Sequence, residues 1–119
     1  MSIYNYHDLE VYREGFDLAV KVHRNTEGFP DEERYGMQSQ VRRSSKSVCA
    51  LIAEGFGRKE SVVEFRRYLR MAFGSVQETK VWLEFAGALD FVDQNVCKEL
   101  TEGYDRLARR IYRMIENWK

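Results

Sequence analysis

Four stretches of the chain place apolar residues at every third or fourth position, and this spacing limits the possible folds more than any other feature of the sequence. Residues spaced in this way lie on one face of an α-helix, so each stretch predicts a helix with one apolar face. No stretch sustains the alternation of apolar and polar residues that is typical of a half-buried β-strand. We therefore expect helices over residues 8–26, 31–55, 62–89 and 94–118.

Helices of this kind gain most of their stability when their apolar faces are buried against one another. The chain has 119 residues, of which 44% are hydrophobic and 32% are charged, and this is enough for one compact domain with a core. Long helices with short connections pack as antiparallel neighbours. We predict a single all-α domain over residues 1–119, an antiparallel up-down-up-down four-helix bundle with left-handed crossings.

Residues typical of helix ends separate the four stretches. Pro30 and the acids Asp31–Glu33 favour a helix start, because proline lacks an N–H that the first turn does not use and carboxylates stabilise the positive end of the helix dipole. Ser61 followed by Glu64 matches a capping box, and Asp93 is a candidate N-cap of the last helix.

The stretch Leu51–Ser61 contains Gly55, Gly57 and two cations, a composition that also occurs in phosphate-binding loops. Such a loop needs its glycines between a strand and a helix, with Lys-Ser or Lys-Thr at a fixed spacing, and this stretch has neither. We expect Gly55 or Gly57 instead to take the left-handed conformation that ends many helices. The stretch is therefore predicted to join two helices.

The charges balance over the whole chain but are unevenly distributed. Nineteen cations and nineteen anions give a net charge of zero, without the basic excess usual in a dedicated nucleic-acid-binding protein. Residues 34–70 carry nine cations and three anions, a net charge of +6, whereas residues 1–33 carry three cations and eight anions, a net charge of −5. This asymmetry indicates either an anionic partner or an arginine-rich outer face that an acidic neighbour neutralises.

The basic residues of the second and third helices are predicted to face away from the core. In a helical hairpin that turns near Arg58, they occupy outer heptad positions, with Arg66 on the flank. They would either contact phosphates, which gives salt-sensitive and largely sequence-independent binding to RNA or DNA, or remain solvated and paired with acids. The candidate nucleic-acid-binding residues are Arg42, Arg43, Lys46, Arg58, Lys59, Arg66, Arg67 and Arg70.

The third helix has more apolar surface than one seam of a bundle requires. Trp82, Phe85 and Leu89 form a second stripe beside the first. They either broaden the core face or form the interface of a homo-oligomer, where aromatic residues are enriched. Tyr4 and Tyr6, near the N-terminus, are further candidates for that interface.

No motif in the sequence indicates catalysis, a metal site or a cofactor. His23 lies on the apolar stripe of the first helix, which is typical of a core or interface histidine, and neither His7 nor His23 belongs to a metalloprotease or triad-like motif. Glu54 and Glu78 have no second acid and no set of metal-ligating residues at helical spacing from them in the sequence. We expect a non-enzymatic protein with no catalytic residue, metal, cofactor or small-molecule substrate.

The sequence also indicates a compartment. Cys49 and Cys97 lie inside helical patterns without a CxxC motif, so we expect two reduced, buried thiols rather than a disulfide. Met1 is followed by polar and charged residues, and no apolar run approaches the roughly 20 residues of a membrane span. We therefore expect a cytoplasmic protein without a membrane partner.

Four runs of the sequence stand out in the middle of the chain: Phe29-Pro30 with Glu33-Arg-Tyr-Gly-Met37, Gln40-Val-Arg-Arg43, Ile52-Ala-Glu-Gly-Phe-Gly-Arg58 and Gly74-Ser-Val-Gln-Glu78. In this order they resemble the four-helix-bundle family of 23S rRNA-intervening-sequence proteins, and the likeness extends over nearly the whole chain. Members are short bacterial bundles, some encoded within inserts of 23S ribosomal RNA genes. They are similar to accessory proteins of diversity-generating retroelements, which form basic pentameric barrels that bind nucleic acid and a reverse transcriptase.

This resemblance implies a homopentamer and favours nucleic acid as the partner of the basic residues, but it supplies no catalytic residue. Leu51 stands where the family often has an asparagine before Ile-Ala-Glu-Gly, and the neutral total charge differs from the retroelement proteins, so the reverse-transcriptase partnership is not carried over. The leading hypothesis is a self-associating bundle, a pentamer by resemblance, that binds structured RNA or another nucleic acid. The alternative is a protein-interaction or scaffold module whose arginines pair with the acidic first helix across subunits.

Overall fold

The structure, a computed structural model, describes residues 3–119. Its four α-helices are α1 (Glu10–Asn25), α2 (Met37–Phe56), α3 (Val62–Ala88) and α4 (Gln94–Asn117). Two 3-10 helices, η1 (Tyr6–Asp8) and η2 (Asp31–Glu33), precede α1 and α2. These residues form no β-strand, and the predicted all-α fold with four helices is confirmed.

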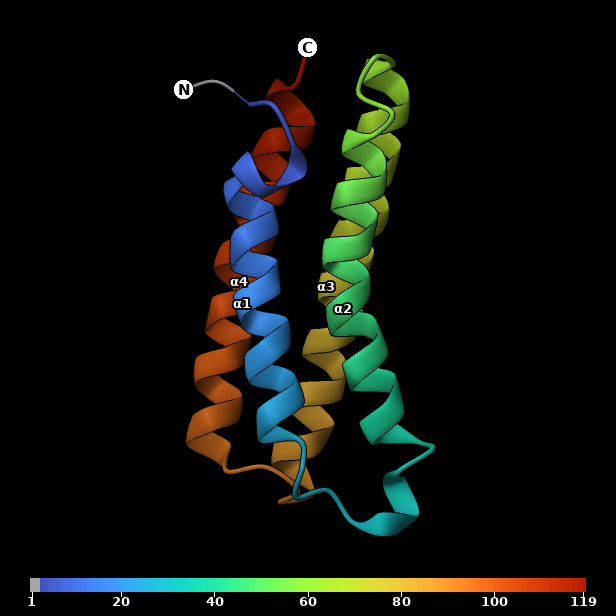
Figure 1. Cartoon of the computed structure of the whole chain (residues 1–119). Coiled ribbons are helices and arrows are strands. Elements are labelled where there is room, and N and C mark those ends of the chain that lie inside the picture. The colour runs from blue at the N-terminus through green and yellow to red at the C-terminus, as the bar shows by residue number, and fades with distance from the viewer. Residues whose placement is uncertain (1–2) are drawn as a thin grey trace.

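Successive helices run in opposite directions, so that α1 and α3 descend while α2 and α4 ascend in the view of Figure 1. α2 packs on α1 and α3, and α4 packs on α3 and α1, which closes a ring of four helices. The N- and C-terminal ends lie at one end of the bundle, together with the joint between α2 and α3 (Figure 1). The left-handed crossing of the helices stays a prediction.

Apolar side chains from all four helices fill the interior of the ring. Val22, Ile52, Phe65 and Tyr104 come one from each helix, and each is completely buried. Phe65 and Tyr104 lie on the apolar stripes predicted for their helices, whereas Val22 and Ile52 lie one position away from theirs. Burial of these side chains holds the helices together. A smaller cluster, near the joint between α3 and α4, comprises Phe29, Ala86, Val92 and Cys97.

Small residues on α2 allow α3 to approach closely. A Cβ atom added to Gly55 would lie 2.5 Å from the Cβ atom of Tyr68, so a larger residue requires α3 to shift. Toward the other end of the two helices, Thr79 Oγ1 donates a 2.8 Å hydrogen bond to Ser44 Oγ, and both residues are completely buried. The polar pair is satisfied internally, so it does not weaken the contact between α2 and α3.

α2 begins later than the sequence predicted. Its first residue is Met37, and Asp31–Glu33 form the separate helix η2. The chain turns at Gly36, where φ is −106° and ψ is −113°, outside the helical range. Glu33 Oε1 accepts a 3.1 Å hydrogen bond from the Met37 N–H, so this acid stabilises the start of α2 from outside the helix.

The prediction that Gly55 or Gly57 takes the left-handed conformation is wrong. Gly55 lies inside α2, and Gly57 ends the helix with a right-handed φ of −63°. The chain tightens there instead, because the Arg58 N–H donates to the Gly55 carbonyl at 2.9 Å and the Lys59 N–H donates to the Phe56 carbonyl at 3.1 Å. These bonds satisfy helix-end carbonyls without a left-handed residue.

The starts of α3 and α4 follow the predicted capping in large part. Ser61 Oγ accepts a 3.2 Å hydrogen bond from the Glu64 N–H. The Glu64 carboxylate pairs with Arg67, while the Ser61 N–H donates to the Arg58 carbonyl, so the reciprocal bond of a capping box is replaced. Asp93 Oδ1 accepts bonds of 2.9 and 3.2 Å from two backbone N–H groups of the first turn of α4, which confirms it as the N-cap.

The close approach of α2 and α3 can be tested with two glycine substitutions. Gly55→Ala should lower the free energy of unfolding by about 1–3 kcal/mol, because the new methyl group must displace Tyr68. Gly74→Ala is the matched control, since a Cβ atom there meets nothing within 4 Å, and it should raise the free energy of unfolding by about 0.5–1 kcal/mol. Urea unfolding followed by circular dichroism measures both. Equal effects would contradict the close approach.

A buried hydroxyl in the core gives a second prediction. Tyr104 Oη is buried without a hydrogen-bond partner among the described residues, and burial raises the pKa of this phenol. Tyr104→Phe removes the unsatisfied group and keeps the ring, so it should raise the free energy of unfolding by about 1 kcal/mol. Thermal unfolding of the two proteins measures the change. A clear loss of stability would mean that the hydroxyl has a partner.

Candidate functional site

A basic pocket lies where the first turns of α2 meet the last turns of α1. Its volume is about 430 Å³. The side chains that line it are His23, Arg34, Tyr35, Gln38, Ser39, Arg42, Arg43 and Lys46, and we call this set the basic pocket. Three of the predicted nucleic-acid-binding residues meet here, and Arg34 adds a fourth permanent cation.

Arg42 reaches from α2 to the end of α1. Its Nε donates a 3.0 Å hydrogen bond to Thr26 Oγ1, and its Nη2 donates a 3.0 Å bond to the His23 carbonyl. These bonds satisfy groups at the C-terminus of α1 and leave Arg42 half-buried, which differs from the expectation that it faces away from the core. The heptad pattern of α2 predicts which residues of α2 point outward, but it does not predict that the end of α1 packs beside Arg42.

His23 completes the pocket from α1. The Lys46 Nζ lies 3.1 Å from His23 Nδ1, and a bond between them requires that Nδ1 carries no proton. Partial burial lowers the pKa of His23, and the charges of Arg42 and Lys46 lower it further, against the opposing effect of Glu27. The pocket is therefore positive around a neutral histidine.

The cations at the mouth of the pocket are accessible. The exposed Arg43 donates from Nη2 to Glu78 Oε2 at 2.6 Å, a surface pair of the kind that contributes little to stability. Across residues 3–119, neither Arg34 nor Lys46 forms an ion pair with an acid. A phosphate would thus meet two unpaired cations and a third whose partner is exchangeable.

Sequence reasoning missed Arg34 and Tyr35. Both lie in the turn between η2 and α2, whereas the sequence placed them inside a helix. Tyr35 is 89% exposed. An exposed aromatic ring beside cations is a surface on which unpaired bases stack. Gly36 in the run Glu33-Arg-Tyr-Gly36 could have indicated that Arg34 and Tyr35 lie in a turn, if it had been interpreted as the last residue before α2.

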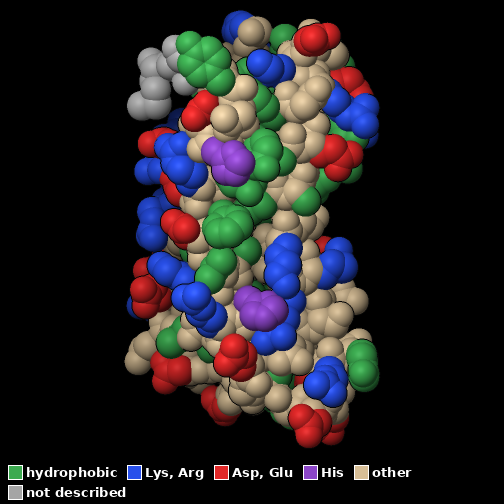
Figure 2. Space-filling model, viewed as in Figure 1, with side chains coloured by type: hydrophobic (Ala, Val, Ile, Leu, Met, Phe, Trp, Pro, Cys, Tyr) green, Lys and Arg blue, Asp and Glu red, His purple; other side chains and the backbone are tan. Residues whose placement is uncertain are grey.

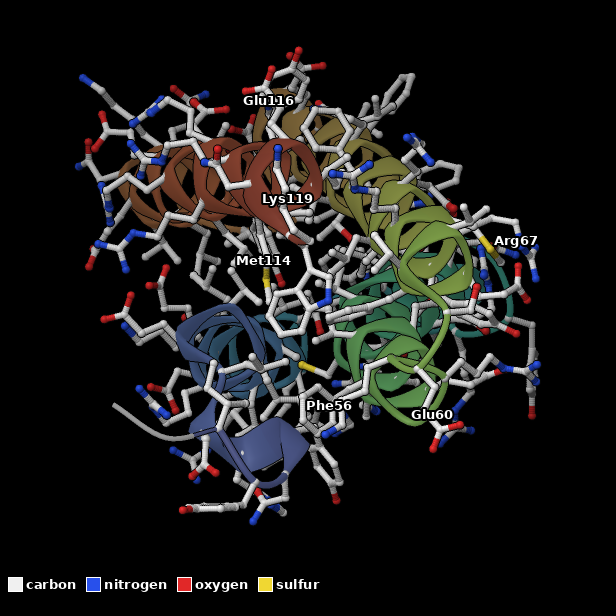
Figure 3. All side chains as sticks on the ribbon, turned by 90° about the horizontal axis from the view of Figure 1, so that it is seen from above. Phe56, Glu60, Arg67, Met114, Glu116 and Lys119 are labelled. Carbon is white, nitrogen blue, oxygen red and sulfur yellow. The ribbon has the colours of Figure 1, made fainter. Side chains whose placement is uncertain are left out.

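Two of the other predicted cations lie on α3 near its joint with α2. Arg66 is half-buried and donates from Nη2 to the Trp118 carbonyl at 2.7 Å, which ties α3 to the end of α4. Arg67 pairs with Glu64 at 3.0 Å, and Figure 3 shows it on the outer side of α3. Arg66 therefore has a structural role, and Arg67 is accessible but paired.

The last three predicted cations are exposed. The Arg58 guanidinium lies 5.1 Å from the centre of the Tyr68 ring, and Lys59 Nζ lies 4.8 Å from that of Phe56. Arg70 has no hydrogen bond or ion pair within residues 3–119. Twelve residues of helix separate Lys46 from Arg58, about 18 Å along the bundle, so the structure does not place all eight predicted cations in one site.

The apolar stripe expected on α3 is partly exposed. Phe85 and Leu89 are 49% and 51% exposed, and Val81, which the sequence analysis did not single out, is 45% exposed. We call these three the α3 apolar stripe. Trp82 beside them is half-buried, and its Nε1 donates a 3.0 Å hydrogen bond to Glu78 Oε2.

Tyr6 belongs to η1 and Tyr4 lies just before it, whereas the α3 apolar stripe lies in the last turns of α3, and these two segments lie at opposite ends of the bundle (Figure 1). Tyr4 is 80% exposed. Tyr6 is half-buried, and its ring lies 4.2 Å from that of His7 and 4.8 Å from that of Tyr12. The structure therefore does not join these tyrosines to the stripe within one chain.

A second cavity, of about 630 Å³, lies between α1 and α2, and we call it the α1/α2 groove. Figure 2 shows hydrophobic side chains along this face, with Lys, Arg and His side chains around its lower part. Its apolar lining includes Tyr12, Phe16, Ala19, Cys49, Ala50 and Ala53. Cys49 and Cys97 are both free and buried, as predicted, and burial raises the pKa of the Cys49 thiol to about 12.

Residues 3–119 contain no group of three or more His, Cys, Asp or Glu side chains placed to hold a metal ion. In the same residues, no helix has both the length and the apolar character that crossing a membrane requires.

Comparisons with known proteins identify a family and a similar fold. The sequence model of a family described as 23S rRNA-intervening sequence protein matches residues 7–113. A solved structure from Bacteroides thetaiotaomicron, described as a protein with unknown function from the S23 ribosomal protein family, has a TM-score of 0.78 and 19% identity, with 90% of this chain and 99% of that chain covered. At this identity the similarity shows the fold. A comparison with curated proteins finds no match.

The positive field of the basic pocket predicts how His23 titrates. Its pKa should lie below the ordinary value of 6.5, and Lys46→Gln should raise it, because the substitution removes a positive charge beside the imidazole. Lys98→Gln, on α4, is the control and should leave the His23 pKa unchanged. Histidine ring signals followed by NMR between pH 4 and 9 measure it. A pKa that does not respond to Lys46→Gln would contradict the close contact.

Proposed function

The chain belongs to the family of 23S rRNA-intervening sequence proteins, and we propose that it binds nucleic acid through phosphate contacts at the basic pocket. The observation that carries the proposal is that Arg34, Arg42, Arg43 and Lys46 line one cavity. Phosphate contacts supply most of the affinity of non-specific nucleic-acid binding, and they need local rather than total positive charge. A protein of zero net charge can therefore bind through this one region.

The kind of nucleic acid follows from the neighbours of these cations. Tyr35 is almost fully exposed beside Arg34, where an unpaired base can stack while its phosphate reaches the pocket. Double-stranded segments offer no such base. The best-supported ligand is thus a nucleic acid with unpaired nucleotides, such as a structured RNA, recognised by backbone and stacking rather than by a base-edge code.

The proposed role is binding without catalysis. The two histidines lie far apart on the chain, and His23 is held by the Lys46 contact. Among the described residues, no aspartate or glutamate lines the basic pocket, and its one candidate general base, His23, has its Nδ1 in contact with Lys46. These observations favour a binding surface over an active site.

Self-association is the second part of the proposal. The three large apolar side chains of the α3 apolar stripe are each about half exposed and lie in one row. An exposed row of this kind is typical of a protein–protein interface. Burying this row against a second copy would remove it from water. We infer an oligomer through this face, with a pentamer as the assembly that the family resemblance favours.

The competing function is a protein-interaction or scaffold module. The α3 apolar stripe also favours this role, because a different protein could cover it. The pair between Arg43 and Glu78 shows that arginines of α2 already find acids within one chain, as this alternative expects between chains. Charge reversal of the arginines distinguishes the two functions. It should remove nucleic-acid binding in the first case and oligomer assembly in the second.

The first test is a titration of labelled hairpin RNA, single-stranded RNA and duplex DNA by fluorescence anisotropy at two salt concentrations. With about three phosphate contacts, from Arg34, Arg43 and Lys46, affinity should fall about 20- to 40-fold when salt rises fourfold. RNA with unpaired bases should bind more tightly than duplex DNA, and Tyr35→Ala should reduce this preference. Binding that does not change with salt would contradict phosphate contact.

Charge reversals locate the site. Arg34→Glu with Lys46→Glu should weaken binding at least tenfold and lower the salt slope by about two. Lys98→Glu with Arg109→Glu, on α4, is the matched control with the same change in net charge and should have little effect. Arg67→Glu with Arg70→Glu tests the second basic region separately. An equal loss in all three variants would indicate a general charge effect instead of a site.

The oligomer is tested independently. Phe85→Ser with Leu89→Ser should reduce the molar mass measured by light scattering to that of smaller species, because both side chains are half exposed in a single chain and would be buried between copies in the proposed oligomer. Val63→Ser with Tyr112→Ser removes exposed apolar side chains elsewhere and is the control. An unchanged mass in the Phe85 and Leu89 variant would contradict the proposed face.

A further inference from the structure

From the α1/α2 groove, we propose a second binding site, for a single-chain amphipathic anion of the medium-chain carboxylate class. The groove is separate from the α3 apolar stripe and runs beside the basic pocket, with which it shares His23 and Lys46. The family match does not point to it, and the sequence pattern shows only its α1 wall, because the other wall comes from α2. The inference does not depend on the proposed nucleic-acid binding.

The groove is large enough for a small molecule and is apolar along its length. About 630 Å³ lies within the range of ligand pockets. The small side chains of Ala19, Ala50 and Ala53 leave the space, and Phe16, which is 50% exposed, stands at its edge. The Cys49 thiol beside them is neutral, since its pKa is raised to about 12. Such walls favour an alkyl chain or an aromatic body.

The two ends of the groove differ in chemistry. The rings of Tyr6 and Tyr12, 4.8 Å apart, lie at one end. Arg24, Lys46 and His23 lie at the other. The distance between the ends is about 16 Å, the length of the α1 segment from Tyr12 to His23. This matches an extended medium-chain alkyl group with its charged head at the basic end.

The charge of the basic end selects the head group. No aspartate or glutamate is among the described residues that line the groove, and neither Arg24 nor Lys46 forms an ion pair there. A carboxylate can accept hydrogen bonds from both cations, whereas an ammonium head would be repelled. The geometry thus favours a free amphipathic anion over a neutral or cationic one of equal length.

The test compares three probes that differ only in the head group: decanoate, 1-decanol and decylamine, each kept below its micelle concentration and titrated by calorimetry. Decanoate should bind at least tenfold more tightly than decylamine. In NMR spectra it should shift backbone amide signals of residues 19–24 and 46–53. Equal affinity for the three probes, or shifts confined to α3 and α4, would overturn the proposal.

Two variants and one matched control assign the site. Ala50→Trp places a large ring in the groove from an exposed position of α2 and should abolish decanoate binding. Arg24→Glu with Lys46→Glu should reduce decanoate affinity at least tenfold and improve decylamine binding. Ala88→Trp, at an exposed position on α3, is the control and should bind decanoate as the unchanged protein does.

The outcomes separate this site from the nucleic-acid site. Ala50→Trp leaves Arg34, Arg42, Arg43 and Lys46 in place, so it should lose decanoate while retaining RNA binding. Decanoate binding that survives Ala50→Trp would overturn the groove as its site. So would binding seen only with phospholipid vesicles and not with the free carboxylate, since the groove accommodates one chain rather than a membrane surface.

Discussion

The arrangement of the bundle depends on how closely α2 approaches α3. Tyr68 packs so close to Gly55 that a Cβ atom on Gly55 would clash with it. Across the same interface, Thr79 donates a hydrogen bond to Ser44, and both hydroxyls are buried. Small residues on one face of α2 thus bring two long helices together over most of their length. The opposite face of α2 also carries small residues, Ala50 and Ala53, but no bulky partner from α1 fills the space beside them, and the α1/α2 groove remains.

That difference between the two faces of α2 determines where binding chemistry can occur. On the α3 side, polar groups are paired internally, as in the hydrogen bond from Thr79 to Ser44. On the α1 side, Lys46 contacts a neutral histidine and pairs with no acid among residues 3–119, so its charge is available to a ligand. The basic pocket and the α1/α2 groove therefore lie side by side on one face, so an anion in the groove would compete with a phosphate for Lys46. Binding of the two ligands would then be coupled.

The arginines of this chain show why residue type alone does not define a binding surface. Arg42 and Arg66 satisfy backbone carbonyls at the ends of α1 and α4, so their first role is to hold helix ends in place. Arg34, on a turn, has no such role and is open to a partner. In a sequence these three positions are equivalent cations near a helix, and only the location of neighbouring helix ends distinguishes them.

The sequence by itself determined the fold class, the four helices, the Asp93 cap and the burial of both cysteines, because each depends on residue spacing or on contacts within one helical turn. It placed the start of α2 wrongly, because the Gly36 turn and the Glu33 cap depend on local backbone geometry that propensity does not fix. The tertiary structure decided which cations stay free, that Arg34 and Tyr35 join them, and that a groove lies between α1 and α2. These features require side chains from separate helices to meet, and the periodicity of one helix carries no information about the neighbour that faces it.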